Sequence, residues 1–296
     1  MYNEIDANKR KSAIIMIAFA GFALAIAYVG GWYLGGRSFA PFAIIAALLY
    51  VVISYFAGAK MTLALNSAKE ISKTDNPRLY RIVENLAITD GIPMPKVYII
   101  TDPAMNAFAT GRDPSHSAVC ATSGLLEALD DTELQGVMAH EMGHVKNYDI
   151  RVSLVAFALA SIIGIISDIV IRSMFWGGGS DDDGPGSNPA FMVIGIIAVI
   201  LSPIVAAIIQ MAISRNREYL ADATGALTTR YPEGLARALE KISAKKEGST
   251  MKRQNSSTAH LFFANPLKGK SVSNLFSTHP PIEDRIKRLR TMGSGS

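Results

Sequence analysis

The alternation of long apolar runs with mixed segments is the clearest pattern in the chain. Four runs, at about residues 12–34, 39–59, 152–175 and 190–213, contain few or no charged residues. A helix needs about 20 apolar residues to cross a bilayer, so each run is long enough. The first run continues through the short turn "GGRS" into the second, without a signal-peptidase cleavage pattern. The pattern therefore predicts two transmembrane hairpins.

Lysine and arginine residues gather on one side of these predicted hairpins. They occur at residues 9–11, at Lys60, at Arg151 and at residues 215–217, whereas the loop between the last two runs carries three aspartates and no lysine or arginine. Cytoplasmic loops of membrane proteins are enriched in lysine and arginine. We therefore expect a multi-pass membrane protein, with both termini and the middle segment in the cytoplasm.

The mixed segments predict cytoplasmic α/β structure. Apolar spacing predicts a helix that begins at Pro77 and ends at Gly91, and "PKVYIITD", "NAFATG" and "SAVCATSG" then predict three short strands. Because these strands are consecutive, we expect a small β-meander. A helix with Asp130 or Asp131 as its N-cap comes next, and "THPPIEDRIKRLRTM" predicts a final helix entered through prolines.

The predicted organisation has four parts. Residues 1–59 form the first transmembrane hairpin and residues 152–213 the second. Residues 60–151 form a cytoplasmic part that begins the soluble domain, and residues 214–296 form a second cytoplasmic part that is mostly helical.

The composition agrees with a membrane protein. Apolar residues make up 49 % of the chain and charged residues 18 %, compared with about 25 % charged residues in soluble domains. The net charge is +4, but the cations flank apolar blocks and form no basic and aromatic stripe, so no nucleic acid partner is expected. Cys120 is the single cysteine, which excludes an intrachain disulfide and fits a reducing compartment.

The predicted helix around "HEMGH" carries candidate metal ligands and a candidate general base. His140 and His144 are four residues apart, so both imidazoles lie on one helix face and can bind one Zn²⁺ ion. Glu141 lies about 100° around the helix from His140. From there it can reach a water molecule at the metal and act as a general base.

A catalytic zinc needs a third protein ligand and an open position. No third histidine follows closely, but "SRNREYLADATGAL" places Glu218 and Asp222 on one face of another predicted helix. Glu218 can be the third ligand, and Asp222 can hydrogen-bond the far nitrogen of a ligand histidine. One Zn²⁺ per chain is therefore expected, although other divalent metals also suit a His₂Glu site.

Four motifs together give the chain a family resemblance. "NAFATG", "HEMGHVKNYD", "SRNREYLAD" and "THPPIEDRIKRL" occur in an order, among apolar runs, that resembles the HtpX family of membrane zinc metalloproteases, a group related to the CAAX prenyl proteases. The resemblance covers nearly the whole chain. It implies an α-helical integral protein of the prokaryotic cell (inner) membrane, with four transmembrane helices and an α+β zincin-type (gluzincin) protease domain.

The resemblance also implies roles for residues. The metal ligands would be His140, His144 and Glu218, with Glu141 as the base. The "NAFATG" run would be an edge strand on which an extended polypeptide pairs, so that Asn106, Ala107 and Phe108 bind substrate. The substrates implied are misfolded or damaged membrane proteins reached at the lipid bilayer.

Three further polar residues have open roles. His279 either stabilises the oxyanion of the reaction as a catalytic residue or packs at the entry of the last helix. Arg217 and Arg285 either orient a carboxylate of the site or form local salt bridges.

Three other functions remain open at this point. A CAAX-type or peptide-processing protease would require a larger lipid-accommodating chamber built from more spans. A non-catalytic membrane protein with structural zinc would require a closed site, usually with cysteine. A transporter would require ionisable residues deep in the spans, where Asp168 and Arg172 are the main ones and can neutralise each other.

Overall fold

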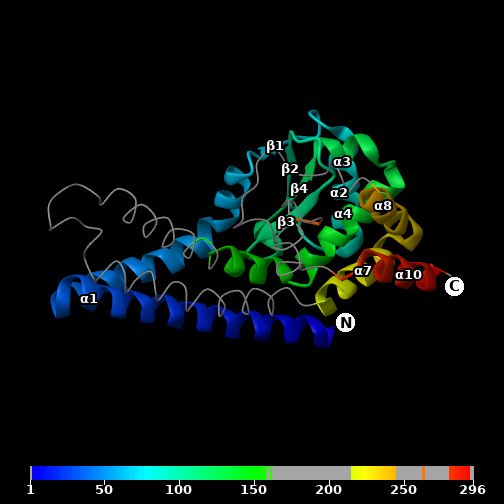
Figure 1. Ribbon diagram of the computed structural model, residues 1–296. Helices are drawn as coiled ribbons and strands as arrows, with labels where there is room; N and C mark the ends of the chain where they lie inside the picture. Colours follow the sequence, from blue (N-terminus) through cyan, green and yellow to red (C-terminus); the bar gives the residue numbers. More distant parts are fainter. Residues whose placement is uncertain (1, 159–160, 162–214, 245–261, 264–279, 294–296) are drawn as a thin grey trace.

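The computed structural model describes residues 2–158, 161, 215–244, 262–263 and 280–293 of the 296-residue chain. Most of the predicted third span and all of the fourth lie outside the described residues, as does His279. The described residues form a helical hairpin joined to an α/β body (Figure 1).

The N-terminal helix α1 (Tyr2–Leu65) folds back on itself, although its backbone is helical throughout (Figure 1). Met16 and Phe19 from its first arm line the same cavity of about 300 Å³ as Val51 and Tyr55 from its second arm. A straight helix would separate Phe19 from Val51 by about 48 Å at 1.5 Å per residue. The two arms therefore lie side by side.

The outer surface of the hairpin is apolar. Among the described helices, the segment Ala40–Leu65 is the one that is long and apolar enough to cross a bilayer, and Ala13–Ala25 is apolar but shorter. Large exposed apolar side chains on the two arms include Ile14, Ile17, Phe42, Leu49 and Phe56. The number of membrane-spanning helices, predicted as four, stays a prediction.

A mixed sheet of four strands has the order β1–β2–β4–β3. The strands are β1 (Lys69–Glu70), β2 (Lys96–Ile100), β3 (Ala107–Gly111) and β4 (Ser117–Thr122). Because β4 pairs parallel with β2 and antiparallel with β3, the predicted β-meander is wrong. Residues 101–106 are too long a connection for a tight hairpin turn, and they leave room for β4 between β2 and β3. β3 is thereby an edge strand of the sheet.

Local sequence signals set the ends of the first helices in this domain. α2 (Pro77–Asp90) begins after Asn76, whose side chain accepts a hydrogen bond from Leu79 N, and it ends at Gly91, where φ is +65°. A short 3₁₀ turn (Pro114–His116) joins β3 to β4, and α3 (Ser123–Ala128) follows β4. These bounds agree with the predicted helix from Pro77 to Gly91.

Helix α4 (Asp131–Lys146) lies between the sheet and the C-terminal helices α7 (Arg215–Thr229), α8 (Pro232–Ala244) and α10 (Ile282–Gly293) (Figure 1). It begins with a capping box made by Asp130 and Glu133. Its apolar side chains belong to the main hydrophobic core together with residues of the sheet, α2 and α8. The helix that carries the histidines is therefore held on both sides.

Two glycines bring α4 and α7 unusually close. A Cβ atom added at Gly143 of α4 would lie 3.2 Å from Ala221 O, and one added at Gly225 of α7 would lie 3.0 Å from His140 N. Larger residues at these two positions would push the helices apart. The close approach places the carboxylates of α7 directly opposite the histidines of α4.

Candidate metal centre

The structure brings together the three predicted metal ligands. The Nε2 atoms of His140 and His144 are 3.1 Å apart. The carboxylate of Glu218 approaches both rings, at 3.7 Å from His140 Nε2 and 3.5 Å from His144 Nε2. One donor atom from each residue lies within 4.8 Å of the other two, and all three side chains are 85 % or more buried.

This donor set fits a zinc ion. Two imidazole nitrogens and one carboxylate oxygen are a ligand set of catalytic zinc sites, which keep a fourth position open. Two nitrogens bound at about 2.0 Å with a tetrahedral angle would be roughly 3.3 Å apart, close to the observed 3.1 Å between the histidines. Binding would therefore require little rearrangement of His140 and His144.

Glu141 lies beside this cluster and is almost completely buried. The backbone N–H of Ala109 in β3 lies near its carboxylate and favours its charged form. Burial raises the pKa of Glu141 to about 7, and the nearby His144 partly opposes this rise. A carboxyl group with a pKa near neutrality can both accept and return a proton at physiological pH.

A buried chain of hydrogen bonds through Asp222 and Arg285 holds the ring of His140. Its Nδ1 lies 2.8 Å from Asp222 Oδ1, so the predicted contact between Asp222 and a ligand histidine is present. Arg285 of α10 donates to both oxygens of Asp222, at 2.7 and 2.9 Å. Burial opposes ionisation of Asp222, but Arg285 and the hydrogen bond with His140 hold its pKa well below the usual range. Arg285 therefore orients a carboxylate of the site, the first of its two predicted roles.

Burial also lowers the pKa of His140, to about 4. The imidazole is therefore neutral at physiological pH. With Nδ1 directed at Asp222, the Nε2 lone pair is available for a metal.

His144 has a carboxylate neighbour that sequence reasoning missed. Its Nδ1 lies 3.2 Å from Oδ2 of Asp149, which is buried. Burial alone would lower the pKa of His144, but the hydrogen bond with Asp149 and the charge of Glu218 raise it to about 9. A zinc ion would therefore displace a proton from His144 on binding. The sequence signal for this contact was the position of Asp149, five residues after the second histidine of the motif. Arg217 lies 3.6 Å from the same aspartate and so forms a local ion pair.

The predicted substrate residues lie on β3, beside Glu141. The backbone of Asn106 faces β4, because its O accepts from Thr122 N at 3.0 Å. Since backbone groups alternate along a strand, those of Phe108 also face β4, and its ring packs against Phe262 in the core. The backbone N–H and C=O groups of Ala107 and Ala109 therefore point away from β4, toward the open edge of the sheet.

The outward carbonyl of Ala107 already has a partner in the chain. Ala107 O accepts a hydrogen bond from Phe263 N at 2.9 Å. The Phe263 ring lies edge-on to His140, with ring centroids 5.2 Å apart, and beneath the guanidinium of Arg285. A short segment of the chain thus occupies one end of the β3 edge next to the metal site.

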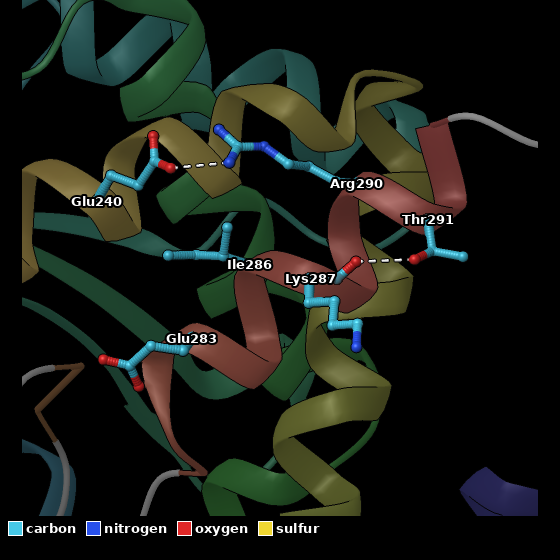
Figure 2. A pocket seen from close by; sticks show the side chains of 6 residues that line it. All are labelled: Glu240, Glu283, Ile286, Lys287, Arg290 and Thr291. Carbon is cyan, nitrogen blue, oxygen red and sulfur yellow. Dashed lines mark hydrogen bonds and ion pairs between the residues drawn. The ribbon is translucent and has the colours of Figure 1, made fainter.

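A groove of about 680 Å³ lies between α8 and α10, separate from this site. Figure 2 shows Arg290 pointing to Glu240 across the groove, and the hydroxyl of Thr291 bonded to the carbonyl of Lys287. None of its six lining residues belongs to the metal cluster. Arg285, on the same helix, is buried on the opposite side against Asp222.

Comparison with known proteins gives a consistent result. The family described as Peptidase family M48 matches residues 73–293. The Protease HtpX homolog of Tropheryma whipplei (strain Twist) is 51 % identical over 99 % of both chains. That of Lactobacillus helveticus (strain DPC 4571) is 44 % identical over 99 % of this chain and 100 % of its own.

A solved structure shares the fold. The crystal structure of S. mikatae Ste24p matches with a TM-score of 0.51 and 18 % identity, over 98 % of this chain and 67 % of that one. At this level of identity the likeness shows the fold alone. Fold and site together define a membrane metalloprotease that depends on zinc. The chain belongs to peptidase family M48, among the HtpX proteases.

Proposed function

We propose that the protein is an endopeptidase that cleaves misfolded or damaged membrane proteins at the cytoplasmic surface of the bilayer. The observation that carries this proposal is the convergence of His140, His144 and Glu218, with Glu141 beside them. The edge strand β3 adjoins the same site, since the backbone of Ala109 lies near the carboxylate of Glu141. Ligands, base and a surface for an extended peptide are therefore next to one another.

In this proposal His140, His144 and Glu218 would hold the zinc ion, which supplies a Lewis acid beside the scissile carbonyl when bound. Glu141 accepts a proton from the attacking water and then gives it to the leaving amine nitrogen. One water and one peptide bond thereby become a carboxylic acid and an amine.

The substrate binds in this proposal as an extended strand along β3. Its backbone pairs with the outward groups of Ala107 and Ala109, so its own amide replaces that of Phe263 at Ala107 O. A folded protein offers few free strands of this kind. The site therefore favours locally unfolded segments, which fits a role in quality control.

The membrane hairpins keep the site at the bilayer surface. We infer four spans, with both termini and the active site in the cytoplasm. The apolar segment Ala40–Leu65 and the exposed apolar side chains of α1 support insertion of the first hairpin. The second hairpin would begin directly after Arg151 and end before α7, so the two ligand-bearing helices flank it.

The test uses the purified full-length protein and its Glu141→Gln and His140→Ala variants. Each is incubated with a panel of membrane and soluble proteins, and the cleavage sites are mapped. Glu141→Gln should keep zinc and lose cleavage, because the amide cannot accept the proton. His140→Ala should lose zinc. Glu127→Gln, an exposed glutamate of α3, serves as the control and should cleave normally. Normal cleavage by Glu141→Gln, or normal zinc content in His140→Ala, would contradict the proposal.

A further inference from the structure

The turn after α4 has an unusual backbone at one residue. Tyr148 has a φ of +62°, a left-handed conformation that is unfavourable for a residue with a side chain. Strained residues of this kind persist where the surrounding structure holds them. The turn reverses the chain directly after the helix and brings Asp149 back to His144, at 3.2 Å.

A second helix holds this turn in place. Asn147 is completely buried, and its Nδ2 donates to Thr224 Oγ1 of α7 at 3.3 Å. Arg217, in the first turn of α7, lies 3.6 Å from Asp149 Oδ1 through Nη1 and is only 6 % exposed. That Nη1 atom has no hydrogen-bond partner among the residues that the structure describes. A buried guanidinium needs a nearby anion, and Asp149 is the anion it faces.

The arrangement repeats the one around His140. There Arg285 holds Asp222, and Asp222 holds His140 Nδ1. Here Arg217 faces Asp149, and Asp149 faces His144 Nδ1. Since Arg217 and Glu218 are adjacent in α7, one helical turn directs a carboxylate to the metal cluster and a cation to the aspartate behind it.

We propose that Asp149 and Arg217 are positioning residues for His144. Asp149 fixes the orientation of the ring, so that Nε2 faces the metal, and Arg217 holds Asp149 in place. The pair also links the end of α4 to the start of α7, and therefore the two histidines to Glu218. This inference rests on the proposed role of His144 as a zinc ligand.

The test measures zinc affinity of the metal-free, detergent-solubilised full-length protein by competition with a chelator of known affinity. Loss of a carboxylate that hydrogen-bonds a ligand histidine weakens metal binding by about 10–100-fold. We expect the zinc affinity of Asp149→Ala to fall by a factor in this range. Asp149→Asn keeps an acceptor for the Nδ1–H group and should lose less. The visible spectrum of the Co²⁺-loaded protein should change in Asp149→Ala, because it reports ligand geometry.

A double variant shows whether Arg217 affects zinc binding through Asp149 or independently of it. Arg217→Ala should weaken zinc binding less than Asp149→Ala, and Arg217→Lys should restore part of the loss. If Arg217 acts through Asp149, then adding Arg217→Ala to Asp149→Ala should cause no further loss. An additive loss, or wild-type zinc affinity and Co²⁺ spectrum in Asp149→Ala, would overturn the proposal.

Asp90 offers a matched control. It is a buried aspartate bonded to Lys146, also at the end of α4, at 2.6 Å, and to Thr228 of α7 at 2.9 Å. Neither of these two partners belongs to the metal cluster. Asp90→Ala should lower thermal stability but leave zinc affinity unchanged. If the wild-type protein itself binds no zinc, the proposed ligand set fails, which is distinct from failure of this inference.

Discussion

At the scale of single residues, burial decides what the polar groups of the site can do. The pKa of the buried His140 falls to about 4, which leaves the ring neutral, and that of Glu141 rises to about 7. Arg285 is also fully buried, but its contact with both oxygens of Asp222 keeps it charged and paired. The ion pair Arg285–Asp222 is the part of the site most sensitive to mutation, because each residue neutralises the buried charge of the other.

Arg285→Met should therefore destabilise the fold strongly. It leaves Asp222 buried without its cation, and breaking a buried ion pair in this way costs about 3–5 kcal/mol. Arg290→Met is the matched control, since Arg290 lies on the same helix and pairs with Glu240 (Figure 2). It also pairs with Glu233, but its side chain is 47 % exposed. That loss should be much smaller, because ion pairs between exposed side chains contribute little to stability. Chemical denaturation of the solubilised protein measures both, and equal losses would contradict the prediction.

At the scale of elements, the edge strand β3 connects the metal site to the substrate. The insertion of β4 between β2 and β3 places β3 at the edge. The outward carbonyl of Ala107 is bonded to Phe263 of the same chain, and the backbone of Ala109 lies near Glu141. A peptide that pairs with β3 must replace the bond to Phe263 before it reaches Ala107.

Phe263→Pro should therefore cleave peptides faster than Phe263→Ala. Both variants lose the ring, but only proline also lacks the N–H group that bonds Ala107 O. A hydrogen bond contributes about 0.5–1.5 kcal/mol, so the kcat/KM of the proline variant should exceed that of the alanine variant by roughly 2–10-fold. The measurement is cleavage of an unstructured peptide in detergent. Equal values, or a slower proline variant, would show that substrates do not pair at Ala107.

At the scale of the whole molecule, the hairpin α1 and the α/β body suit different surroundings. The arms of α1 expose large apolar side chains such as Ile17 and Phe42, whereas the body carries exposed ion pairs such as Lys73–Glu84 and Arg237–Asp130. This division supports the proposed insertion of the hairpin in the bilayer, with the body in water.

The topology can be tested with single cysteines in a Cys120→Ala background. Ser38→Cys, between the two arms of α1, should react with a membrane-impermeant thiol reagent in intact cells. Lys73→Cys, at an exposed position of the body, should react only after the cells are opened. Labelling is read by gel shift. Protection of the first site, or labelling of the second in intact cells, would contradict the proposed orientation.

Local sequence was sufficient wherever neighbouring residues decide the structure. The spacing of His140 and His144 places them on one helix face whatever surrounds the helix. The cap residues Asn76 and Gly91 set the ends of α2 through hydrogen bonds within a few residues. The apolar run predicted at about residues 39–59, which overlaps the segment Ala40–Leu65, follows from composition alone. The sequence also offered Glu218 and Asp222 as a pair, because they are four residues apart.

Only the tertiary structure decided which distant groups meet. Asp222 and His140 are 82 residues apart in the chain, and Arg285 and Asp222 are 63 apart. Their contact depends on how closely α4, α7 and α10 pack, which the glycines at 143 and 225 permit. The place of β3 outside β4 likewise depends on pairing between strands, not on the strand's own residues. The sequence alone determined the chemistry available to the site, and long-range packing decided the partner of each group.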